Sequence, residues 1–316
     1  MTAETDRSPP DRRGLQLPTL TGVSDEHTHD LTELARMPPP DIRLVVTDMD
    51  GTLLDDDRQI HDQFWPLLDE LDARGIAFSP ASGRHHVSLR RQFAPIAERV
   101  TYIASNGAHV LVGSQEVHSD CLDASLAREV LTTMAGVQDA RAVLVGKAGA
   151  YIQRGDEEAF RWMHAYVPPL TVVDDIADAV ETLLSSGDGV LNIGIFDNRA
   201  AEQNSLVALA PLRDRLNIMA THPTWVDVVS PTADKGHAVA ALQADMGIGP
   251  DQTMVFGDFL NDLQMMDRAA YSFAMANAHP DVSRRASWRA PANSANGVVR
   301  TIRAVLGIDA PRPRTP

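Results

Sequence analysis

The sequence Thr-Asp-Met-Asp-Gly-Thr-Leu-Leu at 47–54 directly follows the apolar stretch Ile42–Val46. An apolar run with β-branched residues is typical of a buried strand. Asp48 and Asp50 then lie at the end of that strand, where open α/β sheets bind their ligands in a crevice. Two carboxylates so close together repel each other unless a cation lies between them. The run therefore predicts a hard metal ion and chemistry on an anion.

The length and charge of the chain narrow the classes of function. Its 316 residues allow one large domain or two of medium size. The formal net charge of -15 argues against non-specific binding to nucleic acid and against binding to an anionic membrane surface. A small phosphorylated partner would also be repelled at long range, so a local cluster of metal, Lys and backbone amides would have to attract it.

The sequence contains no sign of export. Cys121 is the only cysteine, so no intramolecular disulfide can form. No uninterrupted apolar stretch is long enough to span a bilayer. The first residues, MTAETDR, lack the apolar segment of a secretory signal. We therefore expect a cytoplasmic protein.

From Asp41 onward, apolar strands alternate with helical patterns. Apolar residues at helical spacing between Phe64 and Leu71 predict a helix that ends near Gly75. Further strands are expected at 76–78 and 101–104, and a further helix at 84–97. This βαβαβ order implies a parallel sheet with right-handed crossovers. The expected fold class is therefore α/β, with a doubly wound, mostly parallel sheet and an inserted α+β cap domain.

The pattern changes near Ala108. Short hairpin strands are expected at 110–112 and 116–118, followed by helices at 125–134, 157–166, 175–184 and 201–213 and strands at 142–145, 170–173, 190–196 and 217–220. The first pattern resumes with a helix from Lys235 to Gly247 and strands at 253–256 and 271–274. We expect a core domain at 41–121 and 222–307 and a cap domain at 122–221. The Pro-rich arm 1–40 and the tail 308–316 are expected to be disordered or loosely attached.

A second acidic sequence, Gly-Asp-Phe-Leu-Asn-Asp at 257–262, also follows an apolar strand. Taken alone, Asp258 is more typical of a helix N-cap, and Asp262 of an acid that complements the helix dipole. Together with Asp48 and Asp50, however, these residues would bring four carboxylates to one sheet edge. Such a cluster is strained without a divalent ion, and oxygen-only ligands suit Mg²⁺.

Polar residues at two further positions are candidates for binding an anion. Ser82 and Gly83 end the second expected strand, where a hydroxyl and free N–H groups at a helix N-terminus form an anion site. An ordinary Ser N-cap is the alternative. Lys235 begins the helix at which the chain re-enters the core. It is either a solvated surface charge or an ammonium that holds the nucleophile and a phosphoryl oxygen.

The remaining candidates have weaker signals. Asn106 and Gly107 follow the third expected strand and form either a hairpin turn or a loop that faces substrate. In and near the cap, no spacing rule selects among the residues that could contact substrate, which are His164, Asp197, His222, Trp225 and Asp227.

Four short motifs occur in one order: Asp-x-Asp-Gly-Thr-Leu-Leu at 48–54, Ser-Gly-Arg at 82–84, Lys-Gly at 235–236 and Gly-Asp-x-x-Asn-Asp at 257–262. This set resembles the haloacid dehalogenase superfamily of phosphohydrolases. The insertion between the second and third motifs is similar to that of the Cof-type, sugar-phosphatase-like branch with a large α/β cap. The runs at 105–108, 274–278 and 296–298 resemble the same branch. The resemblance covers about residues 41–306.

The resemblance implies roles for the matching positions. Asp48 would be the nucleophile that forms an aspartyl-phosphate, and Asp50 would protonate the leaving oxygen and then activate water. The Asp48 carboxylate, the Asp50 backbone carbonyl and Asp258 would hold Mg²⁺, with Asp262 as a supporting carboxylate. The residues that would bind or border the phosphoryl group are Ser82, Lys235 and Asn261.

The expected function is thus a Mg²⁺-dependent phosphatase for a small phosphorylated metabolite, in particular a sugar phosphate. A mutase or phosphotransferase would use the same intermediate but would pass the phosphoryl group to a sugar. A receiver-type signalling protein also has an acidic Mg²⁺ pocket, but it has no place for an insertion of this size. A catalytically silent phosphate-binding protein is the remaining alternative.

Overall fold

The computed structural model describes residues 34, 38–161, 163 and 170–308. Within these residues the chain forms two compact units. The core unit comprises the residues up to 83, then 95–118 and 234–308, and the cap unit comprises 84–94 and 119–233. The expected arm 1–40 and tail 308–316 lie almost wholly outside the described residues.

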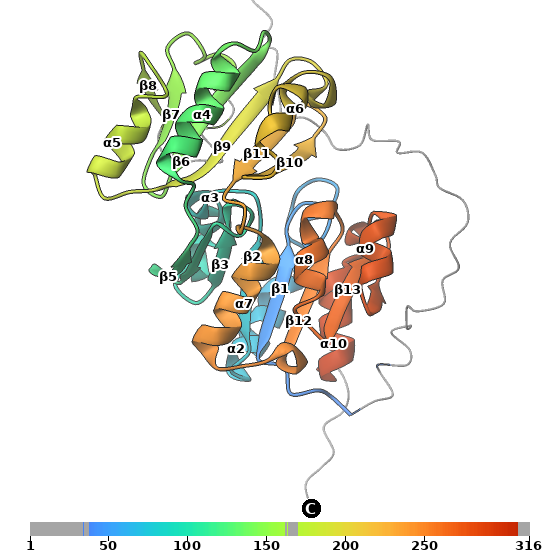
Figure 1. Cartoon of the computed structure of the whole chain (residues 1–316). Coiled ribbons are helices and arrows are strands. Elements are labelled where there is room, and N and C mark those ends of the chain that lie inside the picture. Colours follow the sequence, from blue (N-terminus) through green and yellow to red (C-terminus); the bar gives the residue numbers. More distant parts are fainter. Residues whose placement is uncertain (1–33, 35–37, 162, 164–169, 309–316) are drawn as a thin grey trace, which may run out of the picture. The chain divides into compact units, whose positions relative to one another are not determined.

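The core unit is built on an eight-stranded sheet in the order β14-β13-β12-β1-β2-β3-β4-β5 (Figure 1). The strands are β1 (Leu44–Asp48), β2 (Ala77–Ala81), β3 (Thr101–Ala104), β4 (His109–Val112), β5 (Gln115–Ser119), β12 (Thr253–Gly257), β13 (Tyr271–Met275) and β14 (Trp288–Ala290). The pairs from β14 to β3 are parallel, whereas β3 and β4 are antiparallel. Every residue of the central strand β1 is buried, as expected for a parallel strand covered on both faces.

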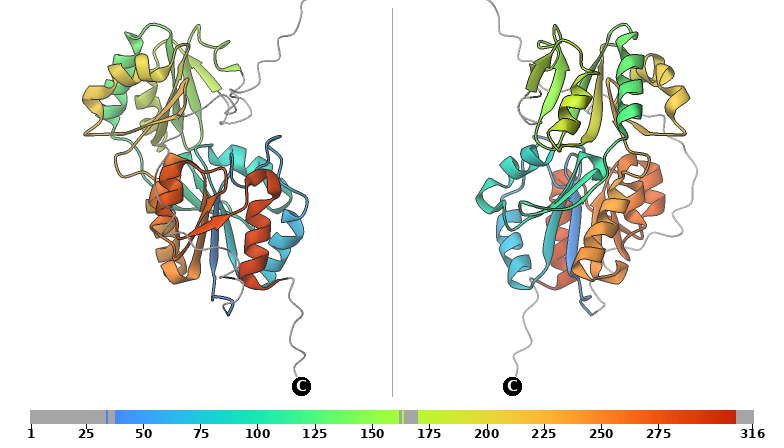
Figure 2. Two further views of the ribbon diagram at one scale, coloured as in Figure 1. Left: turned by 90° about the vertical axis from the view of Figure 1, so that its right-hand side faces the viewer. Right: turned by 60° about the vertical axis from the view of Figure 1, so that its left-hand side comes forward.

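Helices cover both faces of this sheet (Figure 2). The apolar cluster on one face joins β1 and β12 to α7 (Lys235–Met246), α8 (Leu263–Met266) and α9 (Pro280–Arg285). The other face is covered by α2 (Phe64–Ala73) and α10 (Gly297–Leu306), which contact each other. This two-sided cover leaves the ends of the strands as the place where polar side chains can gather.

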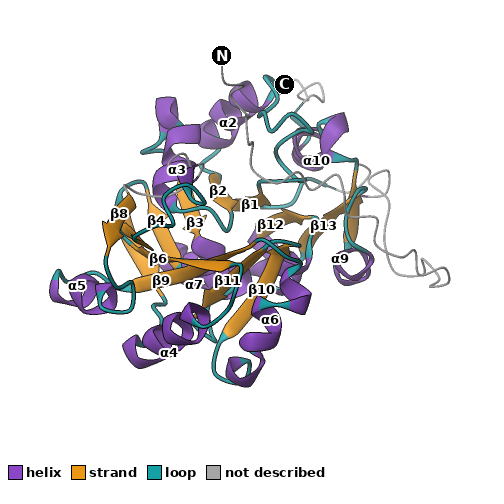
Figure 3. Ribbon diagram, turned by 90° about the horizontal axis from the view of Figure 1, so that it is seen from above, coloured by secondary structure: helices purple, strands orange, loops and turns teal. Residues whose placement is uncertain are grey.

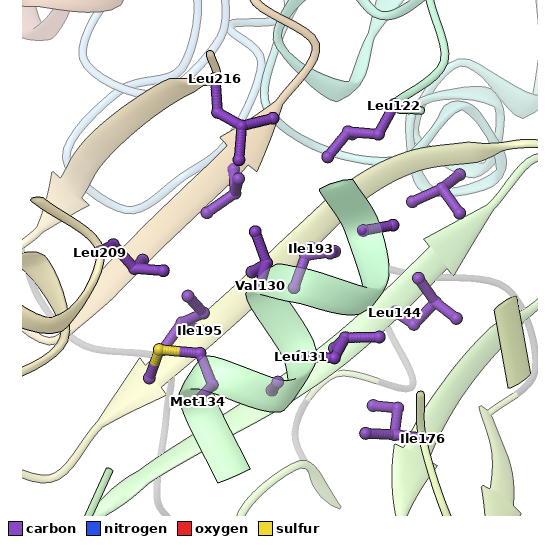
Figure 4. Packing of buried hydrophobic residues seen from close by; sticks show 14 of the residues in the cluster. Leu122, Val130, Leu131, Met134, Leu144, Ile176, Ile193, Ile195, Leu209 and Leu216 are labelled. Carbon is purple, nitrogen blue, oxygen red and sulfur yellow. The ribbon is translucent and has the colours of Figure 1, made fainter. Parts of the chain in front are cut away.

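The cap unit contains a six-stranded sheet in the order β10-β11-β9-β6-β7-β8. Its strands are β6 (Ala140–Gly146), β7 (Ala150–Gln153), β8 (Leu170–Val173), β9 (Val190–Asp197), β10 (Asn217–His222) and β11 (Trp225–Val229). One face of the sheet carries α4 (Ala124–Ala135), α5 (Ala179–Ser185) and α6 (Ser205–Ala208) (Figure 3). Between sheet and helices lies an apolar cluster that includes Leu131, Leu144 and Ile193 (Figure 4).

The expected fold class, an α/β core with a mostly parallel sheet and an inserted α+β cap, is confirmed. The expected return to the core at residue 222 differs from the structure, because β11 pairs with both β10 and β9. Val226 and Val228 of β11 are buried in the apolar cluster of the cap. Residues 222–233 therefore belong to the cap unit, and the chain leaves it after Ala233.

Four expected helices are shorter or absent, and the one expected at 175–184 begins only at Ala179. The helix expected at 84–97 is α3 (His86–Gln92), followed by a separate 3-10 turn at Ala94–Ile96 that contains Pro95. The helix expected at 201–213 is broken at Asn204, whose φ of -135° is not helical, and again near Pro211. Of the helix expected at 157–166, residues 157–160 form turns, 161 and 163 are in 3-10 conformation, and the others lie outside the described residues.

Candidate active site

Three polar segments of the core unit meet because the strands before them are parallel. Asp48 is the last residue of β1, Ser82 follows β2, and Asp258 follows β12. In the ladder, Asp48 lies opposite Ala81 of β2, and Thr47 lies opposite Phe256 of β12. The three strands therefore end at the same edge of the sheet, where the sequence predicted a site.

Lys235 is buried at this edge and links two of the predicted acids. Its Nζ lies 2.5 Å from Asp48 Oδ1 and 2.6 Å from Asp262 Oδ1, and its side chain is 0% exposed. Burial opposes the charged ammonium, but Asp262 and Asp48 outweigh burial and raise the pKa of Lys235. The side chain therefore carries a positive charge, and the alternative of a solvated surface lysine is wrong.

The acids at this edge carry more negative charge than Lys235 neutralises. Asp48, Asp258 and Asp262 each offer a carboxylate oxygen within 4.8 Å of the others. By formal charge, three carboxylates and the ammonium of Lys235 sum to two negatives. An all-oxygen donor set of this kind fits a hard divalent cation. Among the described residues this 4.8 Å group does not include Asp50, whose place as a fourth carboxylate at the edge stays a prediction.

Asp262 supports its neighbours from a fully buried position. It lies in a 3-10 turn at Leu260–Asp262 and is 0% exposed. Its Oδ2 accepts hydrogen bonds from the backbone N–H groups of Asp258 (2.9 Å) and Phe259 (3.1 Å). With Oδ1 on Lys235, both of its oxygens are engaged, so Asp262 orients Asp258 and Lys235.

The turn after β1 packs directly against Asp258. Thr52 is 1% exposed, and its Oγ1 donates a hydrogen bond of 2.8 Å to Asp258 Oδ1. Gly51 has a φ of +90°, and a Cβ there would lie 2.5 Å from Asp258 Oδ2. The close approach of the backbone at residue 51 to Asp258 therefore requires glycine. The sequence reasoning did not assign Thr52 a role, although its place in the run 47–54 was a signal.

Asn106 brings together the candidate phosphate-binding residues. Its backbone N–H donates to the carbonyl of Ser82 (3.0 Å), and its Oδ1 accepts from Asn261 Nδ2 (3.1 Å). A Cβ at Gly83 would lie 3.0 Å from Asn106 Nδ2. Asn106 lies in the 3-10 turn Ser105–Gly107, which joins the antiparallel strands β3 and β4. The hairpin interpretation of Asn-Gly is confirmed, because the turn joins β3 to β4. Asn106 also contacts other candidate residues, and a loop that faces substrate stays a prediction.

Gly107 sets the distance between this turn and the start of α7. Its φ is +99°, and a Cβ there would lie 2.2 Å from the carbonyl oxygen of Asp234 and 2.9 Å from the N of Lys235. Asp234 is the N-cap of α7 and accepts from the N–H of His237 at 2.8 Å. Gly107 therefore helps to place Lys235.

Ser82 does not cap the helix that follows it. The N-cap of α3 is His85, whose side chain accepts a hydrogen bond from the N–H of Val87. Ser82 is instead 3% exposed and held by backbone hydrogen bonds to Ile103 and Asn106. The N-cap lies three residues after Ser82, so the expectation that Ser82 opens this helix is wrong. Binding of an anion by Ser82 stays a prediction.

Two candidate carboxylates of the cap unit are held by neutral donors. Asp197 is 0% exposed and accepts from the N–H groups of Arg199 and Ser205 and from Asn204 Nδ2. Burial raises the pKa of this carboxyl, but the hydrogen bonds outweigh burial, so the pKa lies below its ordinary value.

Asp227 accepts from three side chains, which are Asn192, Thr221 and Trp225. The side chain of His222 contacts the hydroxyl of Thr224. His164 lies outside the described residues.

No helix in the described part of the chain combines the length and the apolar character needed to cross a bilayer. The comparisons with known proteins begin with a family model for haloacid dehalogenase-like hydrolases, which matches residues 45–302. The motifs, the acidic strand edge and the inserted unit all fall within this match.

Two curated relatives are phosphatases by name. The chain is 28% identical over 272 residues to a 5-amino-6-(5-phospho-D-ribitylamino)uracil phosphatase of Escherichia coli, covering 85% of this chain and 98% of the relative. It is 28% identical over 242 residues to an HMP-PP phosphatase of Cronobacter sakazakii, covering 76% and 86%. The solved structure of a subclass IIB sugar phosphatase matches with a TM-score of 0.68 at 20% identity, covering 83% of this chain and 98% of that one. At that identity the likeness concerns the fold.

Proposed function

We propose that this protein hydrolyses a small phosphomonoester through an aspartyl-phosphate on Asp48. The chain belongs to the haloacid dehalogenase-like hydrolases and is one of their phosphatases. The observation that carries the proposal is the buried Lys235 between Asp48 and Asp262, next to Asp258 at one strand edge. Charges from distant parts of the chain are costly to bury together, and such clusters are concentrated at functional sites.

Asp48 is the nucleophile in this scheme. Its carboxylate attacks the phosphorus atom while the bond to the leaving oxygen breaks, and Asp50 gives that oxygen its proton. In the second step Asp50 takes a proton from water, and the water oxygen displaces Asp48 to release inorganic phosphate. The ammonium of Lys235, 2.5 Å from Asp48 Oδ1, orients the carboxylate and offsets its charge.

The metal in this proposal is Mg²⁺. Asp48, Asp258 and the backbone carbonyl of Asp50 would hold it, with Asp262 behind them as a support for Asp258 and Lys235. When bound, the ion neutralises charge on the phosphoryl oxygens. Thr52 keeps the Asp258 carboxylate oriented for this role through its 2.8 Å hydrogen bond.

The phosphoryl oxygens are bound by Ser82 and Lys235 in this proposal. Asn261 lies at the rim of the phosphate site, where its side chain meets Asn106. Gly83 and Gly107 allow the segments around Asn106 to approach each other and the start of α7. These contacts support a compact phosphate site made from three strand ends.

The organic part of the substrate is a small metabolite, and we favour a phosphorylated sugar or sugar alcohol. The name of the E. coli relative contains a phosphoribityl group. A mutase would pass the phosphoryl group to a second sugar hydroxyl, whereas a phosphatase passes it to water.

The cytoplasmic location that we predict rests on the sequence alone.

Release of inorganic phosphate tests the proposal. The purified protein with Mg²⁺ is offered p-nitrophenyl phosphate and a panel of phosphorylated sugars, nucleotides and cofactors, with and without EDTA. We expect rapid, EDTA-sensitive release of phosphate, highest for one group of sugar phosphates. An isomerised sugar phosphate without free phosphate would favour the mutase. No turnover of any member of the panel would favour a receiver-like or silent binding protein.

A further inference from the structure

The turn that carries Asp50 depends on the position of Leu54. Leu54 forms isolated bridges with Asp50 and with Ile60. Its backbone N–H also donates to the carbonyl of Met49 at 2.9 Å, and the N–H of Leu53 donates to the carbonyl of Asp48 at 3.2 Å. The turn is therefore closed by its own backbone, with Leu54 as the residue that joins its parts.

Two asparagines from the C-terminal part of the core unit hold this turn from outside. Asn277 Nδ2 donates to the carbonyl of Gly51 at 2.8 Å, and Asn293 Nδ2 donates to the carbonyl of Leu54 at 3.0 Å. The two asparagines also join each other, because the N–H of Asn293 donates to Asn277 Oδ1 at 3.1 Å. The turn is thus held at the residue after Asp50 and at its bridge partner.

The chemistry of these contacts requires the asparagine side chain. Asn277 uses its amide as a donor toward Gly51 and as an acceptor toward Asn293, so a flipped amide would place two acceptors together and two donors together. Aspartate at this position would keep the acceptor but lose the donor. Asn293 is 9% exposed, so its bond to Leu54 is shielded from water, whereas Asn277 is exposed.

We infer that Asn277 and Asn293 are positioning residues for Asp50. They fix the turn on which Asp50 approaches the leaving oxygen, and they do not touch the reacting atoms. The inference rests on the proposed function, because it assumes that Asp50 donates a proton to the leaving group. Small displacements of a proton donor are costly to catalysis, so a loosened turn should weaken proton donation before it weakens binding of the phosphate.

The dependence of rate on the leaving group isolates this effect. An alkyl phosphate leaves as a strongly basic oxygen and needs the acid, whereas p-nitrophenyl phosphate leaves as a stable anion and does not. The value of kcat/KM covers the steps up to formation of the aspartyl-phosphate, so it excludes the later attack by water. The ratio of the two kcat/KM values on one protein sample is also independent of the fraction of folded enzyme.

The variants are Asn277→Ala, Asn277→Asp and Asn293→Ala. We expect kcat/KM for the best alkyl phosphate of the substrate panel to fall about tenfold in each, and that for p-nitrophenyl phosphate to change by less than about twofold. Gln63→Ala is the matched control, because it removes an amide hydrogen bond to Asn296 of the same C-terminal part without touching the turn. Its ratio should equal that of the wild type.

Asp50→Asn gives the reference for a complete loss of the acid. If Asp50→Asn shows no selective loss with the alkyl phosphate, the proposed role of Asp50 fails, and the inference fails with it. If Asp50→Asn shows the selective loss but the Asn277 and Asn293 variants keep the wild-type ratio, the positioning inference alone is overturned. A selective loss in the asparagine variants and not in Gln63→Ala supports it.

Discussion

Buried carboxylates occur in both units of this protein, but their surroundings differ. In the core unit, Asp48 and Asp262 bind the ammonium of Lys235, and Asp258 lies within 4.8 Å of both acids. In the cap unit, Asp197 and Asp227 are each surrounded by neutral N–H and O–H donors. Burial of an acid therefore does not by itself indicate a functional site, and our proposal rests on the cluster of three acids instead.

The two arrangements differ in how their negative charge is stabilised. A single carboxylate that accepts several hydrogen bonds is stable as an anion and can organise a turn, as Asp197 does for the segment up to Ser205. Three carboxylates within 4.8 Å of one another repel even when each accepts hydrogen bonds. Our proposal assigns a divalent ion to offset this repulsion.

The largest expected effect is that of Asp48→Asn. The variant should lower kcat by at least about 10³-fold because it removes the nucleophile. Its fold should be retained, since the change takes one charge from a crowded acidic site. Phosphate release and a thermal melt of the same sample check both points. Near-normal turnover would show that another residue is the nucleophile.

Lys235→Met tests whether the ammonium holds the core acids together. The variant leaves the acids of the cluster without that charge, so we expect it to lower the free energy of unfolding by about 3–5 kcal/mol without added metal. Added Mg²⁺ should recover more stability in the variant than in the wild type. Urea unfolding with and without Mg²⁺ measures both. Equal stability of variant and wild type in EDTA would contradict the account.

Asp258→Ala tests the proposed role of Asp258 as a metal ligand, and its expected effect is smaller. Loss of one carboxylate should raise the Mg²⁺ concentration for half-maximal activity by about 10–100-fold. The Mg²⁺ titration of phosphate release provides the measurement, with Asp178→Asn as a control at an exposed acid of the cap unit. An unchanged titration in Asp258→Ala would remove this residue from the metal site.

The smallest effect is expected for Asp197→Asn, which tests whether this buried carboxylate of the cap unit has a structural role only. At neutral pH the variant should lower the free energy of unfolding by about 1–3 kcal/mol, because it weakens buried hydrogen bonds. Mg²⁺ dependence and kcat/KM should stay within about twofold of the wild type, since we place this residue outside the catalytic machinery. A large shift of the Mg²⁺ titration would refute a purely structural Asp197.

The pH dependence of the same variant has a defined sign. The folded pKa of Asp197 is lowered, so its charged form stabilises the fold above the unfolded pKa, and this contribution is lost as pH falls through the folded pKa. The stability difference between wild type and Asp197→Asn should therefore be full at neutral pH and should shrink at acid pH. A difference that grows on acidification would contradict the hydrogen-bonded arrangement.

The sequence predicted most of the residues at the sheet edge of the core unit, because each lies in a short local motif. The parallel order of the strands then explains why these motifs come together. Asp48 and Asp258 each end an apolar run, and parallel strands bring such ends to one edge. β11 was missed, because its apolar alternation includes the polar Asp227 and follows a turn. Asn277 was not predicted as a contact of Gly51, since a pairing across 226 residues has no local signal.

The most direct test of the central claim is to locate the cation. Crystals grown with Mn²⁺, which shares the oxygen preference of Mg²⁺, are measured for anomalous scattering. We expect one strong peak at about 2.1 Å from carboxylate oxygens of Asp48 and Asp258, with Lys235 still bound to Asp48 and Asp262. A strong peak elsewhere, with none at this edge, would contradict the claim that the core acids form a metal site.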